Sequence, residues 1–219
     1  TGSYLSSFTL AVTEVTERAD LPMLTLSYSD QITERGFKNI FQTSATSGAQ
    51  ASIALPIIMD LAESETGKRP ETVAIITDNT AASLSSVERM KGGLLDSLGL
   101  EVVMEETFTP PLADATSLVQ RVRQSRPDLL FFLPTVISDA NLILQKMQEF
   151  RVDVPTISFG IAIAEPEVLN VMDADLLEGV MSAVANWGVK GQEELIARLN
   201  ERYGEPWMTQ NAVSTYGDM

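Results

Sequence analysis

The residues of this sequence that could do chemistry are hydroxyl and carboxyl side chains in short polar turns. The turn Asp78-Asn79-Thr80 directly follows the apolar run 72–77. The 219 residues include neither cysteine nor histidine. Because of this, a Ser-His-Asp triad, an imidazole base, a thiolate nucleophile and the usual zinc sites are excluded within the chain. The lack of histidine, the commonest catalytic residue, favours a function other than catalysis.

The charge balance narrows the class of partner. The sequence has 30 acidic and 15 basic residues, which gives a net charge of −15. A surface of this sign repels a phosphate backbone, so nucleic acid is not expected as a ligand. No apolar run approaches the roughly 18 residues of a membrane span. No pair of acidic residues stands out as a catalytic dyad, and we expect most carboxylates to lie on a solvated surface.

The stretch 71–99 predicts one strand–turn–helix unit. Its apolar, β-branched run 72–77 is typical of a strand that is covered on both faces of a parallel sheet. Ser85 and Glu88 have the spacing of a capping box, and Gly99 stands where a helix would end. Ligands of such sheets bind outside the carboxyl ends of the strands. The turn that begins at Asp78 is therefore the expected functional end of this unit.

Strands and helices alternate along the rest of the chain, which predicts a doubly wound α/β fold. Ser47 and Gln50 have capping-box spacing and predict a helix to about Thr66. No glycine-rich phosphate-binding motif follows any predicted strand, so no nucleotide cofactor and no metal is expected. The first predicted element is a helix with no strand before it, and we expect that the upstream part of its domain is missing. The further predicted strands are 22–26, 40–43, 100–107, 128–133, 155–159 and 178–185.

The order of these pieces resembles the type I periplasmic solute-binding proteins, in particular the branched-chain amino acid (Leu/Ile/Val) binding family of bacterial ABC importers. No single motif is diagnostic, but their order and spacing cover nearly the whole chain. The matching segments are Gly2 through Ser6-Ser7, Pro22 through Ser27-x-Ser29, Thr33 to Phe37 with Phe41 to Ser44, Val73 to Thr80, Arg126-Pro127-Asp128, and Arg202 to Pro206 with Tyr216-Gly217.

The resemblance implies two Rossmann-like lobes joined by crossing segments, with the N-terminal lobe incomplete in this chain. It places residues 1–45 in the N-terminal lobe, residues 46–185 in the C-terminal lobe, and residues 186–219 in a return to the N-terminal lobe. Family members bind a ligand between the lobes, where helix N-termini favour a carboxylate. The resemblance implies that the ligand-binding residues are Ser6, Ser7, Ser27, Tyr28, Ser29, Asp78, Ala82, Thr135 and Gly160, with Val136 and Ile161 beside the last two.

Two departures from the family pattern bear on the ligand. Ala82 stands where many members place an aromatic residue over the ligand. The turn Phe159-Gly160-Ile161-Ala162 has no carboxylate where amino-acid binders pair the ligand ammonium. An unpaired ammonium in a closed cleft would cost several kcal/mol. We therefore expect a small carboxylate such as an organic or aromatic acid, although Asp78 could still supply the charge that a branched-chain amino acid needs.

Three classes of function remain open on the sequence. The first is a non-enzymatic, periplasmic or cell-surface solute receptor that closes by hinge motion and delivers its ligand to a membrane permease. The second is a ligand-sensing regulatory domain of the same fold. The third is a doubly wound enzyme that uses Asp78 or another carboxylate at a strand end, with or without Mg²⁺. The resemblance favours the first.

Overall fold

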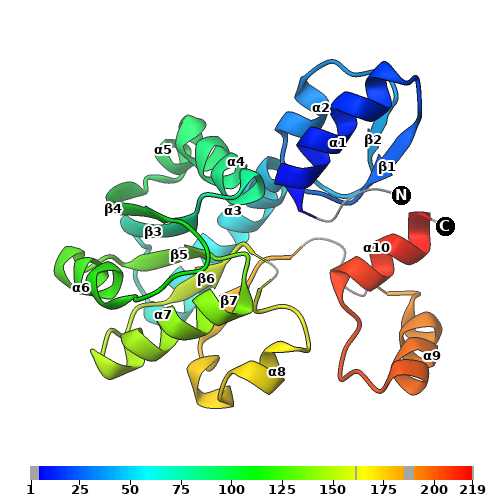
Figure 1. Ribbon diagram of the computed structural model, residues 1–219. Coiled ribbons are helices and arrows are strands. Elements are labelled where there is room, and N and C mark those ends of the chain that lie inside the picture. The colour runs from blue at the N-terminus through cyan, green and yellow to red at the C-terminus, as the bar shows by residue number, and fades with distance from the viewer. Residues whose placement is uncertain (1–4, 161, 185–189, 219) are drawn as a thin grey trace.

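The computed structural model describes residues 5–160, 162–184 and 190–218. Its largest feature is a five-stranded, all-parallel sheet with the strand order β4-β3-β5-β6-β7 (Figure 1). Parallel neighbours need long crossover connections, and here helices or helical turns supply them. This arrangement confirms the predicted α/β fold with a parallel sheet. The strands are β3 (Thr72–Asp78), β4 (Glu101–Phe108), β5 (Leu129–Leu133), β6 (Thr156–Ser158) and β7 (Val180–Ser182).

Helices cover both faces of this sheet. On one face, Ile75 and Phe131 pack with Leu55 and Met59 of the long helix α3. On the other face, alternate residues of the same strands pack against α6 and α7. Successive side chains along a strand point to opposite faces of the sheet. Because helices cover both faces, apolar residues are needed at every position, and the strands therefore carry unbroken apolar runs. The covering helices are α3 (Ser47–Thr66), α4 (Ala81–Arg89), α5 (Leu95–Leu98), α6 (Thr116–Ser125), α7 (Ile137–Glu149) and the short α8 (Val168–Val171).

The helix after β3 differs from the prediction at its start and in its middle. It begins at Ala81 after the N-cap residue Thr80, so Ser85 lies inside α4 rather than at its start. Gly93 has a φ of 107° and breaks the helical path within the irregular turn Met90–Leu94. Gly99 ends α5 in the left-handed conformation (φ 73°), as expected. The early start brings Ala82 and Ser83 into the first helical turn above the sheet edge.

A second, smaller parallel sheet is formed by the N-terminal part of the chain. It consists of β1 (Met23–Thr25) and β2 (Ile40–Gln42), with α1 (Ser6–Arg18) and α2 (Gln31–Glu34) packed against it. Both strands were predicted, within one or two residues at each end. The buried cluster of this region is small and consists of Met23, Ile32 and Ile40.

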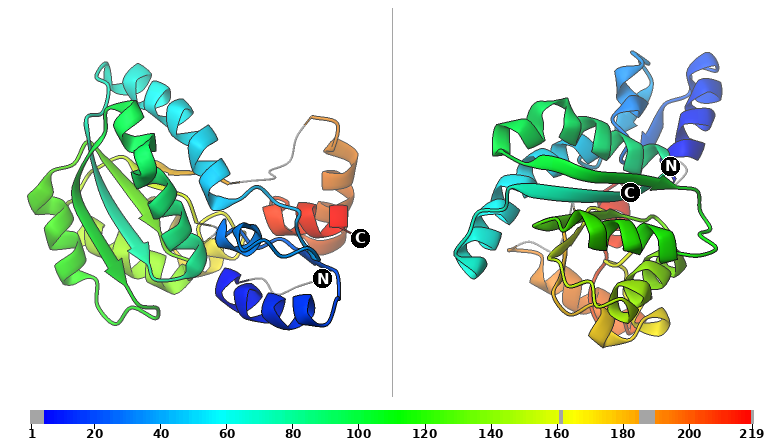
Figure 2. Two further views of the ribbon diagram at one scale, coloured as in Figure 1. Left: turned by 90° about the horizontal axis from the view of Figure 1, so that it is seen from above. Right: turned by 90° about the vertical axis from the view of Figure 1, so that its left-hand side faces the viewer.

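The C-terminal helices α9 (Glu193–Tyr203) and α10 (Gln210–Asp218) lie beside the N-terminal region, away from the large sheet (Figure 2). The Tyr28 hydroxyl donates to Asn211 Oδ1 over 3.4 Å, which joins the two ends of the chain. This arrangement fits the expected return of the chain, but the boundaries at residues 45/46 and 185/186 stay a prediction. None of the helices in the described part of the chain is long and apolar enough to cross a membrane.

Candidate functional site

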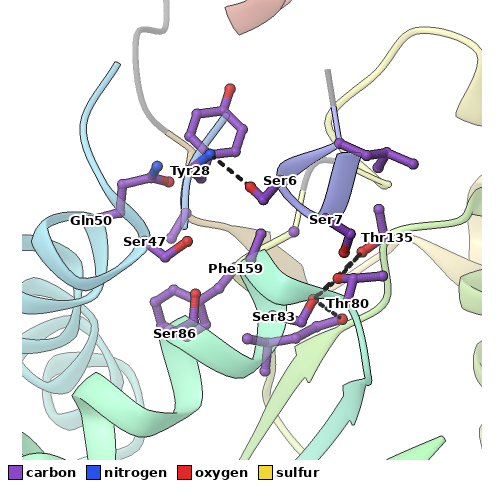
Figure 3. A pocket seen from close by; sticks show the side chains of 15 residues that line it. Ser6, Ser7, Tyr28, Ser47, Gln50, Thr80, Ser83, Ser86, Thr135 and Phe159 are labelled. Atoms are coloured by element: carbon purple, nitrogen blue, oxygen red, sulfur yellow. Dashed lines mark hydrogen bonds between the residues drawn. The ribbon is translucent and has the colours of Figure 1, made fainter. Parts of the chain in front are cut away.

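A pocket opens at the carboxyl edge of the five-stranded sheet, where the strand order reverses. The chain leaves β3 toward β4 on one side and later reaches β5 on the other. Crevices at such reversal points are the usual ligand sites of open α/β sheets. The pocket collects residues from the starts of several helices and from strand ends (Figure 3). Its polar lining consists of Ser6 and Ser7 of α1, Tyr28, Ser47 and Gln50 of α3, Thr80, Ser83 and Ser86 at α4, and Thr135.

Two serines of α1 reach in opposite directions. Ser6 Oγ accepts hydrogen bonds from the backbone N–H groups of Tyr28 and Ser29, each over 3.1 Å. Ser7 Oγ accepts from Ala81 N over 3.3 Å and so connects α1 with the start of α4. A serine hydroxyl has one proton besides its two lone pairs. Within the described residues both hydroxyl groups only accept hydrogen bonds, which leaves each proton for a ligand.

Asp78 lies beneath the pocket and does not line it. The residue is fully buried, and both of its carboxylate oxygens accept hydrogen bonds from the protein. Oδ1 accepts from Thr80 N (3.0 Å) and Thr80 Oγ1 (2.7 Å), while Oδ2 accepts from Thr135 N (2.6 Å). The structure therefore does not offer Asp78 as the partner of a ligand ammonium or of Mg²⁺. Its carboxylate fixes the two threonines that do line the pocket.

These anchored threonines form a hydroxyl cluster with Ser83 (Figure 3). Thr80 gives its proton to Asp78, and Ser83 Oγ donates to the carbonyl oxygen of Leu133 over 3.1 Å. Thr135 Oγ1 lies 3.1 Å from Thr80 Oγ1 and 3.5 Å from Ser83 Oγ. Because Thr80 and Ser83 have already committed their protons, the Thr135 hydroxyl is the donor of this cluster. It can donate to Thr80 or to a bound acceptor.

The opposite end of the pocket is formed by Tyr28, Ser47 and Gln50. Ser47 N donates to Tyr28 O over 2.7 Å, and Gln50 Nε2 donates to Ala45 O over 2.8 Å. Thr46, not Ser47, is the N-cap of α3, since its hydroxyl accepts from Ala49 N over 3.2 Å. The N-cap thus lies one residue before the predicted Ser47, and the predicted Ser47–Gln50 capping box does not form. The Ser47 and Ser86 hydroxyls make no side-chain hydrogen bond within the described residues, and both line the pocket.

The apolar part of the lining comes from the ends of the strands. Phe159 follows β6 and packs edge-to-face against the buried Phe131, with 5.3 Å between ring centroids. Leu5, Ala82, Leu133 and Ala183 complete this part.

Gly160 also lines the pocket, and its small size matters there. A Cβ at this position would lie 2.6 Å from Pro134 O, so only glycine fits. Ile161, which was expected beside it, lies outside the described residues. A ligand that reached this wall would meet apolar side chains and backbone.

The pocket has no formal charge among the described residues, because no Asp, Glu, Lys or Arg lines it. Its electrostatics come instead from the N-termini of helices, whose free N–H groups carry partial positive charge. The N-cap residues of α4 and α7 accept no hydrogen bond through their side chains, although Ser7 Oγ accepts from Ala81 N at the start of α4. A site with hydroxyl donors, helix N-termini and no carboxylate favours an anion. The described residues also contain no cluster of three acidic side chains that could hold a metal ion.

The structure brings together six of the predicted site residues and leaves three out. Ser6, Ser7, Tyr28, Ala82, Thr135 and Gly160 line the pocket. Asp78, Ser27 and Ser29 are buried behind it. Ser27 Oγ lies 2.6 Å from Thr9 Oγ1, and Ser29 Oγ has no hydrogen-bond partner within the described residues. The two serines thus belong to the packing between α1 and the loop after β1.

Several residues that line the pocket were not predicted from the sequence. Ser47 and Gln50 were interpreted only as capping residues, and Ser86 and Phe159 were not singled out as ligand contacts. Their positions in the sequence could have identified them, because each stands in the first two turns of a helix or directly after a strand. Those positions face the same edge of the sheet.

Comparisons with known proteins agree with this geometry. The family model described as "Periplasmic binding protein" matches residues 1–219. A leucine binding protein from Thermotoga maritima superposes with a TM-score of 0.81 at 17% identity, over 100% of this chain and 61% of that one. No match was found among curated protein sequences.

Two further solved structures show a similar fold. A solute binding protein of an ABC transporter from Rhodopseudomonas palustris, in complex with 3,4-dihydroxybenzoic acid, has a TM-score of 0.72 at 21% identity, over 98% of this chain and 57% of that one. A fatty acid ABC transporter substrate-binding protein from Thermomonospora curvata has a TM-score of 0.79 at 18% identity, over 97% of this chain and 54% of that one. The chain thus spans 54 to 61% of the length of these three proteins.

Proposed function

Since the chain belongs to the periplasmic binding protein family, we propose that it binds a small carboxylate that lacks an α-ammonium group and does not transform it. The observation that carries this proposal is the surplus of hydrogen-bond donors in a pocket without formal charge. Within the described residues, the hydroxyl protons of Ser6 and Ser7 have no protein acceptor, and the proton of Thr135 can go only to another hydroxyl group. A carboxylate accepts several such bonds, and charge-assisted bonds are about twice as strong as neutral ones.

The same lining argues against a ligand ammonium. An ammonium group needs acceptors or a carboxylate when it leaves water. Asp78, the carboxylate that lies beneath the pocket, has both oxygens occupied by Thr80 and Thr135. Pairing Asp78 with a ligand would break bonds that hold the hydroxyl cluster in place. An acid with an aliphatic or aromatic body fits both the donors and the wall around Phe159.

The ligands in the neighbours' titles cover this range. One neighbour is a leucine binding protein, another was solved with 3,4-dihydroxybenzoic acid, and a third belongs to a fatty acid transporter. All three ligands carry a carboxylate, and two of them lack the ammonium. This diversity supports the view that the family fold fixes the carboxylate end, while the lining selects the body.

We extend the proposal to closure of the two lobes and delivery of the ligand, because the chain belongs to the periplasmic binding protein family. Residues 1–45 and 186–219 belong to one lobe and residues 46–185 to the other. A ligand that contacts Ser6 and Ser7 on one lobe and Thr135 on the other shifts the population toward the closed state. The closed, extracytoplasmic protein then presents its ligand to the membrane permease of an ABC importer.

Thermal shift measurements test the ligand class. The probes are 4-methylpentanoate, 3,4-dihydroxybenzoate and the primary amide of each acid. A specific ligand at about 100 times its Kd adds ~2.7 kcal/mol to the free energy of unfolding, which raises the melting temperature by several degrees. We expect at least one acid to do so and its amide not to. If no acid raises the melting temperature more than its amide, the proposal is wrong.

A further inference from the structure

One buried carboxylate joins the N-terminal region to the five-stranded region. Asp30 lies at the start of α2 and is 9% exposed. Its Oδ1 accepts from Thr46 Oγ1 over 2.8 Å and faces Arg89 Nη2 at 3.4 Å. Its Oδ2 accepts from Gly48 N over 2.9 Å and from Ser85 Oγ over 3.1 Å. The backbone N–H of Asp30 also donates to Ser85 Oγ over 3.1 Å.

The packing around Asp30 is close. A Cβ added to Gly48 would lie 2.8 Å from Asp30 Oδ1 and 2.7 Å from Arg89 Cγ. A larger residue at this position would therefore push the Asp30 and Arg89 side chains out of their present contact. Burial raises the pKa of Asp30, but the hydrogen bonds from Thr46, Gly48 and Ser85 outweigh it, and the pKa lies below its ordinary value. The carboxylate is thus held ionised in this contact.

The position of this contact in the chain gives it a mechanical role. Thr46 is the N-cap of α3, so the contact includes the segment by which the chain passes from the small sheet to the large one. Tyr28 is two residues before Asp30, and its carbonyl oxygen accepts from Ser47 N over 2.7 Å. Tyr28 and Ser47 both line the pocket. Asp30 therefore keeps one wall of the pocket assembled from both regions.

A second contact between the same two regions is much weaker. Ser7 Oγ accepts from Ala81 N over 3.3 Å, and no charged group takes part in this bond. In contrast, the carboxylate of Asp30 receives three hydrogen bonds from neutral donors and faces the guanidinium of Arg89. Bonds to an ionised acceptor are roughly twice as strong as neutral ones. When the two regions separate, the Ser7 side should open first.

We infer that Asp30 is a positioning residue at the pivot between the two regions, which holds them together at the chain crossing while the Ser7–Ala81 side opens and closes. This inference rests on the closure that we proposed above as part of the binding cycle. Without the carboxylate, Gly48, Ser85 and Thr46 lose their common acceptor. The small region is then held to α3 and α4 by fewer bonds, among them the Arg89–Glu34 ion pair (2.8 Å) and the bond from Ser47 N to Tyr28 O (2.7 Å), and we expect it to move more. Figure 1 shows the small region beside these two helices.

Spin-label distances measure this motion in the full chain without any ligand. The chain has no cysteine, so labels can be placed at Ala11→Cys in α1 and Gln120→Cys in α6, which are both exposed sites. Double electron–electron resonance gives the distance distribution of the parent protein, which includes the opening and closing of the Ser7–Ala81 side. For Asp30→Ala we expect a broader distribution with added long distances, while the far-UV circular dichroism stays unchanged. Asp30→Asn keeps an acceptor oxygen and should return part of the way to the parent distribution.

The control is Asp60→Asn, which also removes a carboxylate but lies on the outer side of α3 and has a side chain that is 77% exposed. It should keep the parent distribution. If Asp30→Ala does not fold, Ser85→Ala is measured in its place. This variant removes one hydroxyl of the contact, so we expect a smaller broadening of the distance distribution. A folded Asp30 or Ser85 variant with the parent distribution overturns the inference. The spin-label distances are measured without ligand, so they do not depend on the thermal shift screen. If the variants broaden the distance distribution but no acid raises the melting temperature, the proposed ligand class is wrong and the role of Asp30 still stands.

Discussion

The two parallel sheets of this protein are covered very differently. In the five-stranded sheet, Ile75 and Phe131 on one face and Ile76 and Phe132 on the other are all fully buried. In the two-stranded sheet, the opposed pair Met23 and Ile40 is buried, whereas the next opposed pair is exposed. That exposed pair is Leu24 (37%) and Phe41 (51%).

The difference shows which region can stabilise itself. A sheet of five strands with helices on both faces has its own core, while two short strands have too little apolar contact to fold independently. Helix α1 adds to the imbalance, because Phe8 and Val15 on its outer face are about 60% exposed. Within the described residues, the small region depends on its polar contacts with α3 and α4, above all those of Asp30.

The largest expected effect tests this contrast in stability. Phe131→Ala removes a fully buried ring in contact with Phe159 and should lower the free energy of unfolding by about 3–5 kcal/mol. Phe41→Ala, the matched control in the small sheet, should change it by no more than about 0.5 kcal/mol. Urea denaturation of both variants checks this prediction. Similar losses in the two variants would show that the small sheet also has a packed core.

The next effect concerns the pocket rather than the core. Thr135→Val keeps the shape of the side chain and removes the free donor of the hydroxyl cluster. We expect about a tenfold loss in affinity for the bound acid, which corresponds to ~1.4 kcal/mol. Calorimetric titration measures it, with Thr107→Val on the exposed part of β4 as the control. An unchanged Kd for Thr135→Val would remove this hydroxyl from the binding site.

A smaller effect on stability is expected from Ser29, which is buried behind the pocket. Ser29 Oγ is buried without a hydrogen-bond partner within the described residues. Replacing an unpaired hydroxyl with a methyl hydrogen is neutral or stabilising, so Ser29→Ala should raise the free energy of unfolding by up to about 1 kcal/mol. It should leave acid binding unchanged, because Ser29 does not line the pocket. A marked loss of affinity would restore Ser29 to the ligand contacts that the sequence predicted.

The smallest effect depends on pH. Burial, together with the nearby Glu167 and Glu205, raises the pKa of Glu165 above its ordinary value, although Asn211 donates to it over 2.8 Å. A raised carboxyl pKa means that the folded state holds the proton more tightly, so stability falls as the pH rises above about 4.3.

Glu165→Gln should therefore be more stable than the parent protein at pH 7.5, and this advantage should shrink as the pH falls toward 4.5. Urea denaturation at both pH values measures it. Glu201→Gln, at an exposed site on α9, should show no such trend. An advantage of Glu165→Gln that is equal at both pH values would contradict the assignment.

The sequence predicted the strands well because buried parallel strands leave an unmistakable apolar run, as in 72–77 and 129–133. Helix starts were harder. Thr80 and Thr46 are the N-cap residues of α4 and α3, although Ser85 and Ser47 have the spacing of a capping box. The strand–turn–helix pattern and the resemblance both pointed to the sheet edge where the pocket lies, but Asp78, Ser27 and Ser29 are buried behind that pocket. Spacing cannot show which of several polar groups in one turn anchors the backbone and which faces the cavity.

The most direct test of the binding account is a calorimetric comparison of leucine with 4-methylpentanoate, which differ only in the α-ammonium group. Because no Asp or Glu among the described residues lines the pocket, the account predicts at least tenfold tighter binding of 4-methylpentanoate at pH 7. Tighter binding of leucine would contradict it and would mean that a carboxylate reaches the ligand after all.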